Sequence, residues 1–300
     1  MEKEISETGI KTGVRVNPKI FIIILNYNGR DFIKKCLTSV FKVDYPNFEV
    51  VVVDNDSSDG SLEEAKNSFS KAHFIKNEAN LGFSTGNNVG IRFALERMAK
   101  YVLLLNNDTE VEADFLTKLV EVAEREEKIG IASPVILNGA DKQVWFAGGK
   151  IDWLTMGTKH KTKVAQDDFY ETGFITGCAM LVKANVFKAI GLLDEDYFLY
   201  WEDADFSVRA KKAGFKNVVV SGSWAYHFEK SEQEKKNKTY WLIVSGLLFF
   251  KKNTPTILKP WITGYVFLRR IKNLADVLLK RNEFAPVVQK AYKDFKDAKF

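Results

Sequence analysis

Three runs of apolar residues, each followed directly by polar residues, constrain the fold of this chain most strongly. They are rich in isoleucine, valine and leucine, and they comprise Ile20–Leu25, Phe48–Val53 and Tyr101–Leu105. Continuous apolar runs of this length are typical of strands that are buried on both faces of a sheet. Helical patterns lie between and after them, at 33–41, 87–99 and 112–127. This alternation predicts an α/β fold with a mainly parallel central sheet flanked by helices.

The polar residues that follow these runs are candidates for a binding site, because such sheets bind ligands at the carboxyl ends of their strands. Asp54-Asn55 could bind a base edge or a ribose hydroxyl, although tight turns use the same residue types. Asn106-Asn107-Asp108 offers one carboxylate, which could hold Mg²⁺ or Mn²⁺ together with a diphosphate. The alternative for Asp108-Thr109 is a helix cap. Both alternatives stay open on these segments alone.

Three acidic residues, Glu202, Asp203 and Asp205, lie within four positions at the start of a helix predicted over 203–213. Like charges this close raise at least one pKa, which suits a general base or a metal site. The alternative is an acidic helix N-terminus that the helix dipole favours. His227 follows a strand predicted at 218–220 and could complete a Mn²⁺ site, although a lone histidine is usually structural.

The second half of the chain is less regular. We expect a hairpin over Gln143–Ile151 around Gly148-Gly149, a mobile loop over Asp152–Tyr170 and a strand over Phe174–Val182. The pattern becomes helical from Lys238 onward. The predicted organisation is therefore a flexible tail (1–18), an α/β domain (19–232) and a helical, basic and amphipathic region (233–300).

The C-terminal forty residues carry nine basic and four acidic side chains, which accounts for the whole net charge of +5. A basic end fits an anionic membrane surface or an anionic partner, or it is a solvated helix face. The apolar stretches Trp241–Phe250 and Ile257–Leu268 fall short of the about 20 residues that span a bilayer. Residues 1–18 lack the apolar core of a signal peptide, and the two cysteines lie in apolar runs. We expect a cytoplasmic protein, peripheral on the inner face of the cell membrane.

Some enzyme classes are excluded by the motifs that the sequence lacks. No Gly-x-Gly-x-x-Gly follows a strand, so the dinucleotide-binding fingerprint is absent, and no P-loop pattern occurs.

The polar segments taken together resemble glycosyltransferase family 2, in particular its rhamnosyltransferase-like branch. Six segments match in family order over about residues 20–230, and six in order are far more specific than any one. They are Leu25-Asn26-Tyr27-Asn28, Val53–Ser61, Asn80–Gly90, Leu105–Thr109, Thr176–Leu181 and Glu202–Phe206.

The resemblance implies a GT-A fold, the nucleotide-diphospho-sugar transferase fold, here with a C-terminal helical extension. It implies an inverting, metal-dependent transfer of a sugar, with rhamnose as a candidate, from a UDP- or dTDP-linked donor to a glycan or lipid-linked acceptor in cell-surface polysaccharide synthesis. Asp203 matches the catalytic base, and Asp108 is the carboxylate of the D-x-D position, where the first acid is an amide here. We predict Mn²⁺ or Mg²⁺ at Asp108 and His227, and acceptor contacts at Gly177, Trp201 and Glu202. The predicted donor-binding residues are Asn26, Tyr27, Asn28, Asp54, Asn55, Asn80, Gly82, Phe83, Asn87, Asn106 and Asn107.

Two other functions compete with this interpretation. A sugar nucleotidyltransferase would share an acidic metal site at the strand ends, but it also needs a Gly-rich, basic triphosphate loop, for which Asn26–Arg30 is a poor match. A non-catalytic nucleotide-sugar-binding subunit would not need both Asp108 and Asp203. The chain departs from the family at Val244-Ser245, where many relatives carry Arg-Asn.

Overall fold

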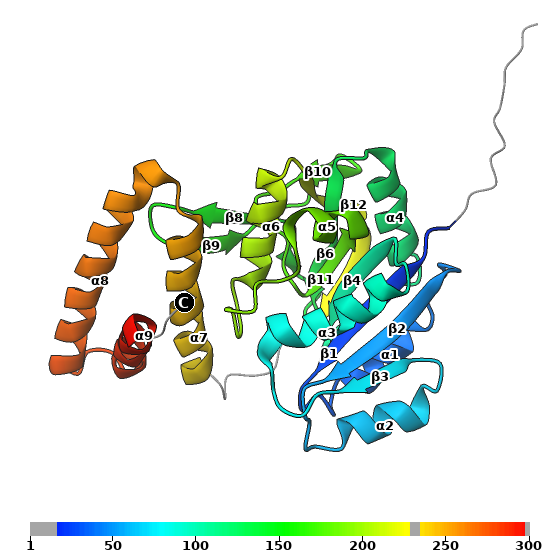
Figure 1. Ribbon diagram of the computed structural model, residues 1–300, viewed down its shortest axis with the longest axis horizontal. Helices are drawn as coiled ribbons and strands as arrows, with labels where there is room; N and C mark the ends of the chain where they lie inside the picture. The colour runs from blue at the N-terminus through cyan, green and yellow to red at the C-terminus, as the bar shows by residue number, and fades with distance from the viewer. Residues whose placement is uncertain (1–16, 229–234, 298–300) are drawn as a thin grey trace, which may run out of the picture.

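The computed structural model describes residues 17–228 and 235–297, and Figure 1 shows an α/β body with helices attached at one side. Within these residues ten strands form one sheet, and eight of them run in the order β10-β12-β6-β11-β4-β1-β2-β3. The other two, β5 and β7, pair with β12 and β6. Most of the predicted tail and the predicted boundary near residue 232 lie outside the described residues.

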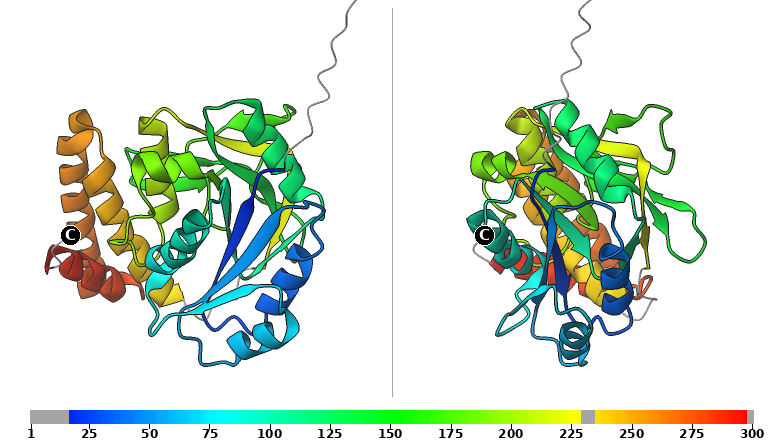
Figure 2. Two further views of the ribbon diagram at one scale, coloured as in Figure 1. Left: turned by 45° about the vertical axis from the view of Figure 1, so that its right-hand side comes forward. Right: turned by 90° about the vertical axis from the view of Figure 1, so that its right-hand side faces the viewer.

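Four parallel strands form one half of the sheet. They are β1 (Ile20–Asn26), β2 (Phe48–Asp54), β3 (His73–Lys76) and β4 (Tyr101–Asn106). Helices cover both faces, with α1 (Ile33–Val40) and α3 (Gly82–Glu96) on opposite sides in Figure 2, which is why the central strands β1 and β4 are apolar up to their last residue. The edge strand β3 is only half-buried and has mixed side chains. The strand predictions are confirmed, and each long strand continues one residue into its polar segment. The register pairs Asn26 with Asp54, so the polar strand ends lie side by side.

The helices in this half differ from their predicted bounds for local reasons. Helix α3 begins five residues earlier than expected, because its glycine-rich first turn packs against the segment around Phe198, whose carbonyl accepts from the Phe83 N–H at 2.6 Å. Helix α2 (Ser61–Ser68) follows β2. The third predicted helix is shorter than expected, since α4 spans Phe115–Arg125 and β5 (Thr109–Val111) precedes it. Asp108-Thr109 therefore does not cap a helix.

The other half of the sheet is mixed. Strand β11 (Ala179–Lys183) runs antiparallel to both β4 and β6 (Ile129–Asn138), whereas β12 (Lys216–His227) is parallel to β6. The sequence pattern did not indicate β6, in which Gly130 and Pro134 interrupt the apolar run. Strand β11 starts five residues later than predicted, and the segment before it contains Gly177. Helices α5 (Ala184–Ile190) and α6 (Glu202–Lys212) connect β11 to β12.

The predicted hairpin over 143–151 is wrong, because its two halves pair with different partners. Strand β7 (Val144–Phe146) pairs with β6. The chain then turns away at Gly148, whose φ of +103° is readily adopted by glycine but rarely by other residues. Strand β8 (Gly149–Asp152) pairs instead with β9 (Gly157–His160). The segment 152–170 is therefore not a structureless loop; it holds β9 and the start of β10 (Phe169–Glu171).

The C-terminal residues are helical, as predicted. Helix α7 (Lys235–Asn253) packs on the body, and a 3-10 turn, η2 (Thr256–Leu258), joins it to α8 (Lys259–Leu278) and α9 (Ala285–Asp297). The Phe249 and Phe250 side chains of α7 are fully buried in the same core as the sheet residues. Among the described residues, no helix is both long and apolar enough to cross a membrane.

Candidate active site

A carboxylate and an imidazole face each other at the C-terminal edge of the sheet. The Oδ1 atom of Asp108 lies 3.3 Å from Nε2 of His227, and it accepts no hydrogen bond from the described residues. Their positions follow from strand pairing, because β5 begins at Thr109, which pairs with His227 at the end of β12. The Trp145 ring packs on His227, with ring centroids 4.6 Å apart, and fixes the imidazole.

This pair fits a divalent cation. Neighbouring ligands of an octahedral ion at about 2.1 Å lie about 3 Å from each other, close to the observed O···N separation. Oδ1 of Asp108 is buried and accepts no hydrogen bond from the part of the chain that the structure describes, and buried polar atoms normally have a partner, which a cation could provide here. No third histidine, cysteine or acid joins the pair within 17–228 and 235–297, so further ligands would come from a bound diphosphate and water.

The predicted donor residues around β1 form a network of hydrogen bonds. The Asn26 amide donates to Oδ1 of Asp54 at 2.9 Å and to the Ser61 hydroxyl at 2.9 Å. Oδ1 of Asn26 accepts from the Asn107 amide at 2.9 Å, which joins the β1 and β4 ends. Gly29 sits against this pair so closely that any added Cβ would lie 2.2 Å from the Asn107 amide nitrogen. These contacts hold the C-terminal ends of β1, β2 and β4 together beneath the loops that follow these strands.

Asp54 and Asn55 lie below the surface, and contacts within the chain occupy their side chains. Asp54 accepts from the Ser57 N–H at 2.9 Å as well as from Asn26. Asn55 donates to the Gly82 carbonyl at 2.9 Å and accepts from the Asn77 amide at 2.8 Å. In this arrangement both side chains hold loops in place and have almost no exposed surface, so their direct contact with a base or ribose stays a prediction.

The other predicted donor residues divide into exposed and structural ones. Half of the Tyr27 side chain is exposed, beside Asn28 in the left-handed region at φ 49°. The Asn80 side chain accepts from the Gly82 N–H at 3.0 Å and sets the turn before α3. Asn87 is buried and donates to the Phe83 carbonyl inside the same helix.

The segment around Gly177 connects the Asp108–His227 pair to the acidic helix α6. The Asn106 N–H donates to the Cys178 carbonyl at 3.0 Å, and the Gly177 N–H donates to Oδ2 of Asp203 at 3.0 Å. Burial raises the pKa of the Cys178 thiol, and the charges of Asp108 and Asp203 raise it further, so both acids lie near this residue. Three segments that are far apart in sequence therefore meet at one edge.

The three acids of α6 have different surroundings. Asp203 is half-buried, and its other oxygen accepts from the Ala204 N–H at 2.7 Å. Burial raises its pKa, and these N–H groups oppose that shift. Glu202 is buried, and its Oε2 has no hydrogen-bond partner among the described residues. Burial and then the neighbouring Asp203 charge hold the pKa of Glu202 well above its usual range.

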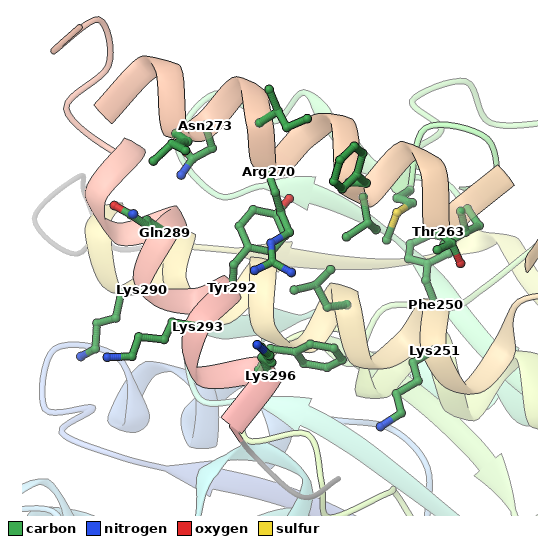
Figure 3. A pocket seen from close by; sticks show the side chains of 18 of the residues that line it. Phe250, Lys251, Thr263, Arg270, Asn273, Gln289, Lys290, Tyr292, Lys293 and Lys296 are labelled. Atoms are coloured by element: carbon green, nitrogen blue, oxygen red, sulfur yellow. The ribbon is translucent and has the colours of Figure 1, made fainter. Parts of the chain in front are cut away.

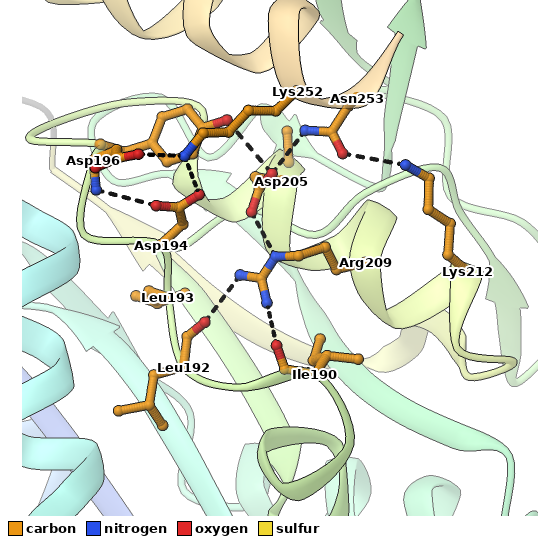
Figure 4. Close-up of polar contacts among 12 residues, drawn as sticks. Ile190, Leu192, Leu193, Asp194, Asp196, Asp205, Arg209, Lys212, Lys252 and Asn253 are labelled. Carbon is orange, nitrogen blue, oxygen red and sulfur yellow. Dashed lines mark hydrogen bonds and ion pairs between the residues drawn. The ribbon is translucent and has the colours of Figure 1, made fainter. Parts of the chain in front are cut away.

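Asp205 is a structural residue, as Figure 4 shows. It accepts from Arg209 at 2.7 Å and from the Asn253 amide of α7 at 2.7 Å. Arg209 also donates to the carbonyls of Ile190 and Leu192. This network ties α6, the preceding loop and α7 together, which leaves Asp203 as the acid with access to a ligand.

The backbone before α6 is strained. Tyr200 and Trp201 both have positive φ, at 67° and 71°, where non-glycine residues are rare. The strain persists because α7 holds the segment: Trp201 donates to the Leu242 carbonyl at 3.2 Å and packs on Phe249, and the Ser245 hydroxyl donates to the Leu199 carbonyl at 2.7 Å. Strained residues of this kind cluster at active sites.

Several of these supporting residues are not predicted by the sequence pattern. They share the role of holding site loops by hydrogen bonds, and they are Ser57, Ser61, Asn77 and Ser245. Ser245 stands at the family departure Val244-Ser245, where the structure shows a buried contact to the loop before α6. The contacts of Ser61, Asn77 and Ser245 join residues far apart in the chain, so local sequence offers no signal for them, whereas Ser57 bonds Asp54 only three residues away.

Together, the mixed sheet, the strand-end polar network and the acidic helix define a GT-A glycosyltransferase. Residues 21–191, more than half of the chain, match the family described as Glycosyl transferase family 2, and the chain belongs to that family.

Individual proteins support the same assignment. The chain is 28% identical to the low-salt glycan biosynthesis hexosyltransferase Agl10 of Haloferax volcanii, over 73% of this chain and 70% of the relative. It is 25% identical to the N-acetylglucosaminyl-diphospho-decaprenol L-rhamnosyltransferase of Mycobacterium tuberculosis, over 69% and 75% of the two chains. The mannosyltransferase PcManGT of Pyrobaculum calidifontis, solved with GDP-Man and Mn²⁺, has the same fold, with a TM-score of 0.60 and 16% identity over 95% of this chain and 77% of that chain.

Proposed function

We propose that this glycosyltransferase moves a sugar from a UDP- or dTDP-linked donor to a glycan or lipid-linked acceptor, with inversion at the anomeric carbon, in cell-surface polysaccharide synthesis. L-rhamnose is the first candidate sugar, because a relative that matches over most of its length is an L-rhamnosyltransferase. The observation that carries the proposal is the half-buried Asp203 carboxylate, held at the sheet edge that also carries Asp108 and His227.

Asp108 and His227 would hold the divalent cation, Mn²⁺ or Mg²⁺. A cation there neutralises the charge that grows on the nucleoside diphosphate as it leaves. The unbonded Asp108 oxygen and the fixed imidazole support this assignment. PcManGT, which shares the fold, was solved with Mn²⁺.

Asp203 would act as the general base. Its two oxygens are oriented by the N–H groups of Gly177 and Ala204, which leaves further lone pairs to accept the proton of an acceptor hydroxyl. The hydroxyl oxygen then attacks the anomeric carbon from the face opposite the diphosphate. One displacement inverts the configuration, so no nucleophilic side chain is needed. General base catalysis of this kind contributes about 10² to 10⁴ in rate.

Glu202 would stay protonated during the reaction. Its buried carboxyl is costly to ionise next to Asp203, and a neutral acid costs less to bury than a carboxylate. Gly177 and Trp201 would flank the acceptor. Among the predicted residues for the nucleotide sugar, Tyr27 is best placed to stack on a base, because the residue is half exposed. Asp54 and Asn55 would support this site from below.

The test is a donor panel with the full-length protein. UDP-, dTDP- and GDP-sugars are incubated with Mn²⁺ or Mg²⁺, and release of the nucleoside diphosphate is measured with and without candidate acceptors. We expect metal-dependent release from UDP- or dTDP-linked sugars, accelerated by the acceptor, and a product with inverted anomeric configuration by NMR. Release of pyrophosphate from a nucleoside triphosphate and a sugar phosphate would instead identify a nucleotidyltransferase.

A further inference from the structure

Helix α8 exposes a continuous apolar stripe to solvent. Six of its large apolar side chains are between 48% and 73% exposed, and Ile262 is the only residue of the helix that is buried. Spacings of three, four and seven residues place them on one face of the helix. The stripe consists of Trp261, Phe267, Leu268, Ile271, Leu274 and Leu278. Exposed apolar surface of this extent marks an interaction site.

The stripe borders a groove of about 1360 Å³ between α7, α8 and α9. Figure 3 shows the groove, whose apolar lining includes Phe250, Ile262 and Val266. Phe267 and Ile271 belong to both the stripe and the groove, so the two features form one continuous surface. We call the stripe and the groove together the C-terminal face.

The charged residues around the groove are nearly all basic. Among the residues that the structure describes, one acid, Asp297, lines it along with six cations. The cations are Lys251, Lys259, Arg270, Lys290, Lys293 and Lys296. A second copy of the chain on this face would bring two basic rims together, which is unfavourable. An anionic partner with an apolar interior matches both the charge and the stripe.

We propose that the C-terminal face docks on an anionic lipid bilayer, with α8 lying in the interface. An amphipathic helix binds there by burying its apolar side between acyl chains while flanking cations meet the headgroups. Trp261 suits the membrane–water boundary, where its amphipathic ring is favoured. This inference rests on the surface alone and does not depend on the donor or the metal.

Docking here would fix the orientation of the active site. The Nε1–H of Trp261 donates to the Leu154 carbonyl at 2.9 Å, which joins α8 to the β8–β9 hairpin. On the other side, α7 holds the loop before α6: its Lys252 forms ion pairs with Asp194 at 2.6 Å and Asp196 at 2.5 Å. A bilayer bound at α8 would therefore be held at a set distance from Asp203.

The experiment is vesicle flotation with the full chain. Vesicles of phosphatidylcholine alone are compared with vesicles that also contain phosphatidylglycerol, at 0.1 M and 1 M salt. We expect binding to the anionic vesicles that is at least tenfold tighter than to the neutral ones and that weakens at high salt, because salt screens the headgroup attraction. Equal binding to both compositions, or none to either, would overturn the proposal.

Two variants with matched controls test the face itself. Phe267→Gln should weaken binding about tenfold, while Met98→Gln, at an apolar residue that is 86% exposed on the sheet body, should leave it unchanged. Replacing Lys259, Lys293 and Lys296 with Gln should weaken binding by roughly a hundredfold. The same change at the exposed Lys42, Lys66 and Lys71 removes equal charge and should have little effect.

Three results would contradict the proposal. Controls that lose as much binding as the face variants would show attraction to net charge or to any apolar residue. Binding that survives in both face variants would place the contact elsewhere. The third result is a chain that does not bind vesicles, forms a dimer in sedimentation velocity and loses that dimer in Phe267→Gln. In that case a second copy of the chain would occupy the C-terminal face. Donor hydrolysis without vesicles should be normal in both face variants, which separates this test from that of the proposed function.

Discussion

His227 Nε2 lies 3.3 Å from the buried Oδ1 of Asp108. The two residues are far apart in sequence, and the pairing of strands β5 and β12 brings them together. The pairing of β5 with β12 sets this separation, and the Trp145 ring holds the imidazole in place. The D-x-D position has a single carboxylate here, and in the proposed metal site His227, from the far end of the domain, would be the second ligand.

The first prediction concerns this pair. Asp108→Ala should abolish transfer while the fold persists, because the variant removes the only carboxylate of the pair. In a thermal-shift titration with Mn²⁺ and a nucleoside diphosphate, the parent should be stabilised by the combination, and Asp108→Ala should not. His227→Ala should weaken the Mn²⁺ response by about tenfold or more, the range known for lost support of a metal site.

Asp114→Ala serves as the control for this prediction. Asp114 lies just before α4 and pairs with Lys118 on the helix surface, so its loss should leave the Mn²⁺ response intact. An Asp108→Ala enzyme that turns over at a near-normal rate would show that the metal is held elsewhere.

The second prediction is that Asp203 is the base and Glu202 is not. Asp203→Asn keeps the size of the side chain but cannot accept a proton, so kcat should fall by about 10² or more. Affinity for a nucleoside diphosphate should stay near normal. Glu202→Gln mimics the protonated acid and should reduce kcat far less. The decisive measurement is kcat for both variants with the true acceptor, and a normal Asp203→Asn beside an inactive Glu202→Gln would reverse the roles.

The third prediction concerns pH. A base must be deprotonated, so kcat should fall as pH decreases through the pKa of Asp203. Because burial raises this pKa, the acidic limb of the pH–kcat profile should lie above the ordinary aspartate value of about 3.9. The limb should keep its position in Glu202→Gln, since glutamine mimics the protonated acid that we propose for Glu202. A limb that disappears in Glu202→Gln would mean that Glu202 is the titrating group.

The fourth prediction concerns the Asp205 network. Asp205→Ala leaves the guanidinium of Arg209 without its charge partner, and the Asp205 side chain is almost fully buried. Removing one partner of a buried pair costs about 3 kcal/mol or more of unfolding free energy. Asp196→Ala removes an exposed partner of Lys252 and should cost less than about 1 kcal/mol. Urea unfolding of both variants checks the difference, and equal losses would show that Asp205 is not the anchor between α6 and α7.

The parts of the fold that local pattern specifies could be predicted from the sequence. The runs 20–25, 48–53 and 101–105 became β1, β2 and β4, because a strand buried on both faces is apolar at nearly every position. Strand β6 was not predicted, because Gly130 and Pro134 break its apolar run and much of its burial comes from elements distant in sequence, β11, β12 and α6. The predicted hairpin over 143–151 is wrong because β7 pairs back with the preceding strand β6 and β8 pairs forward with the following strand β9, so Gly148-Gly149 separates two pairs of strands.

The sequence by itself determined which residue types stand at the strand ends and at the start of α6, because turns, strand ends and helix starts follow local rules. It could not determine which of the acids are available to a ligand. Burial decides that, and burial depends on the whole fold. Asn253 and Arg209 bond Asp205, the core encloses Glu202, and of the three acids of α6 only Asp203, beside Gly177, is partly exposed. Likewise, the partner of Asp108 was settled by the registry of β5 with β12, since the 3.3 Å contact exists only once distant strands have paired.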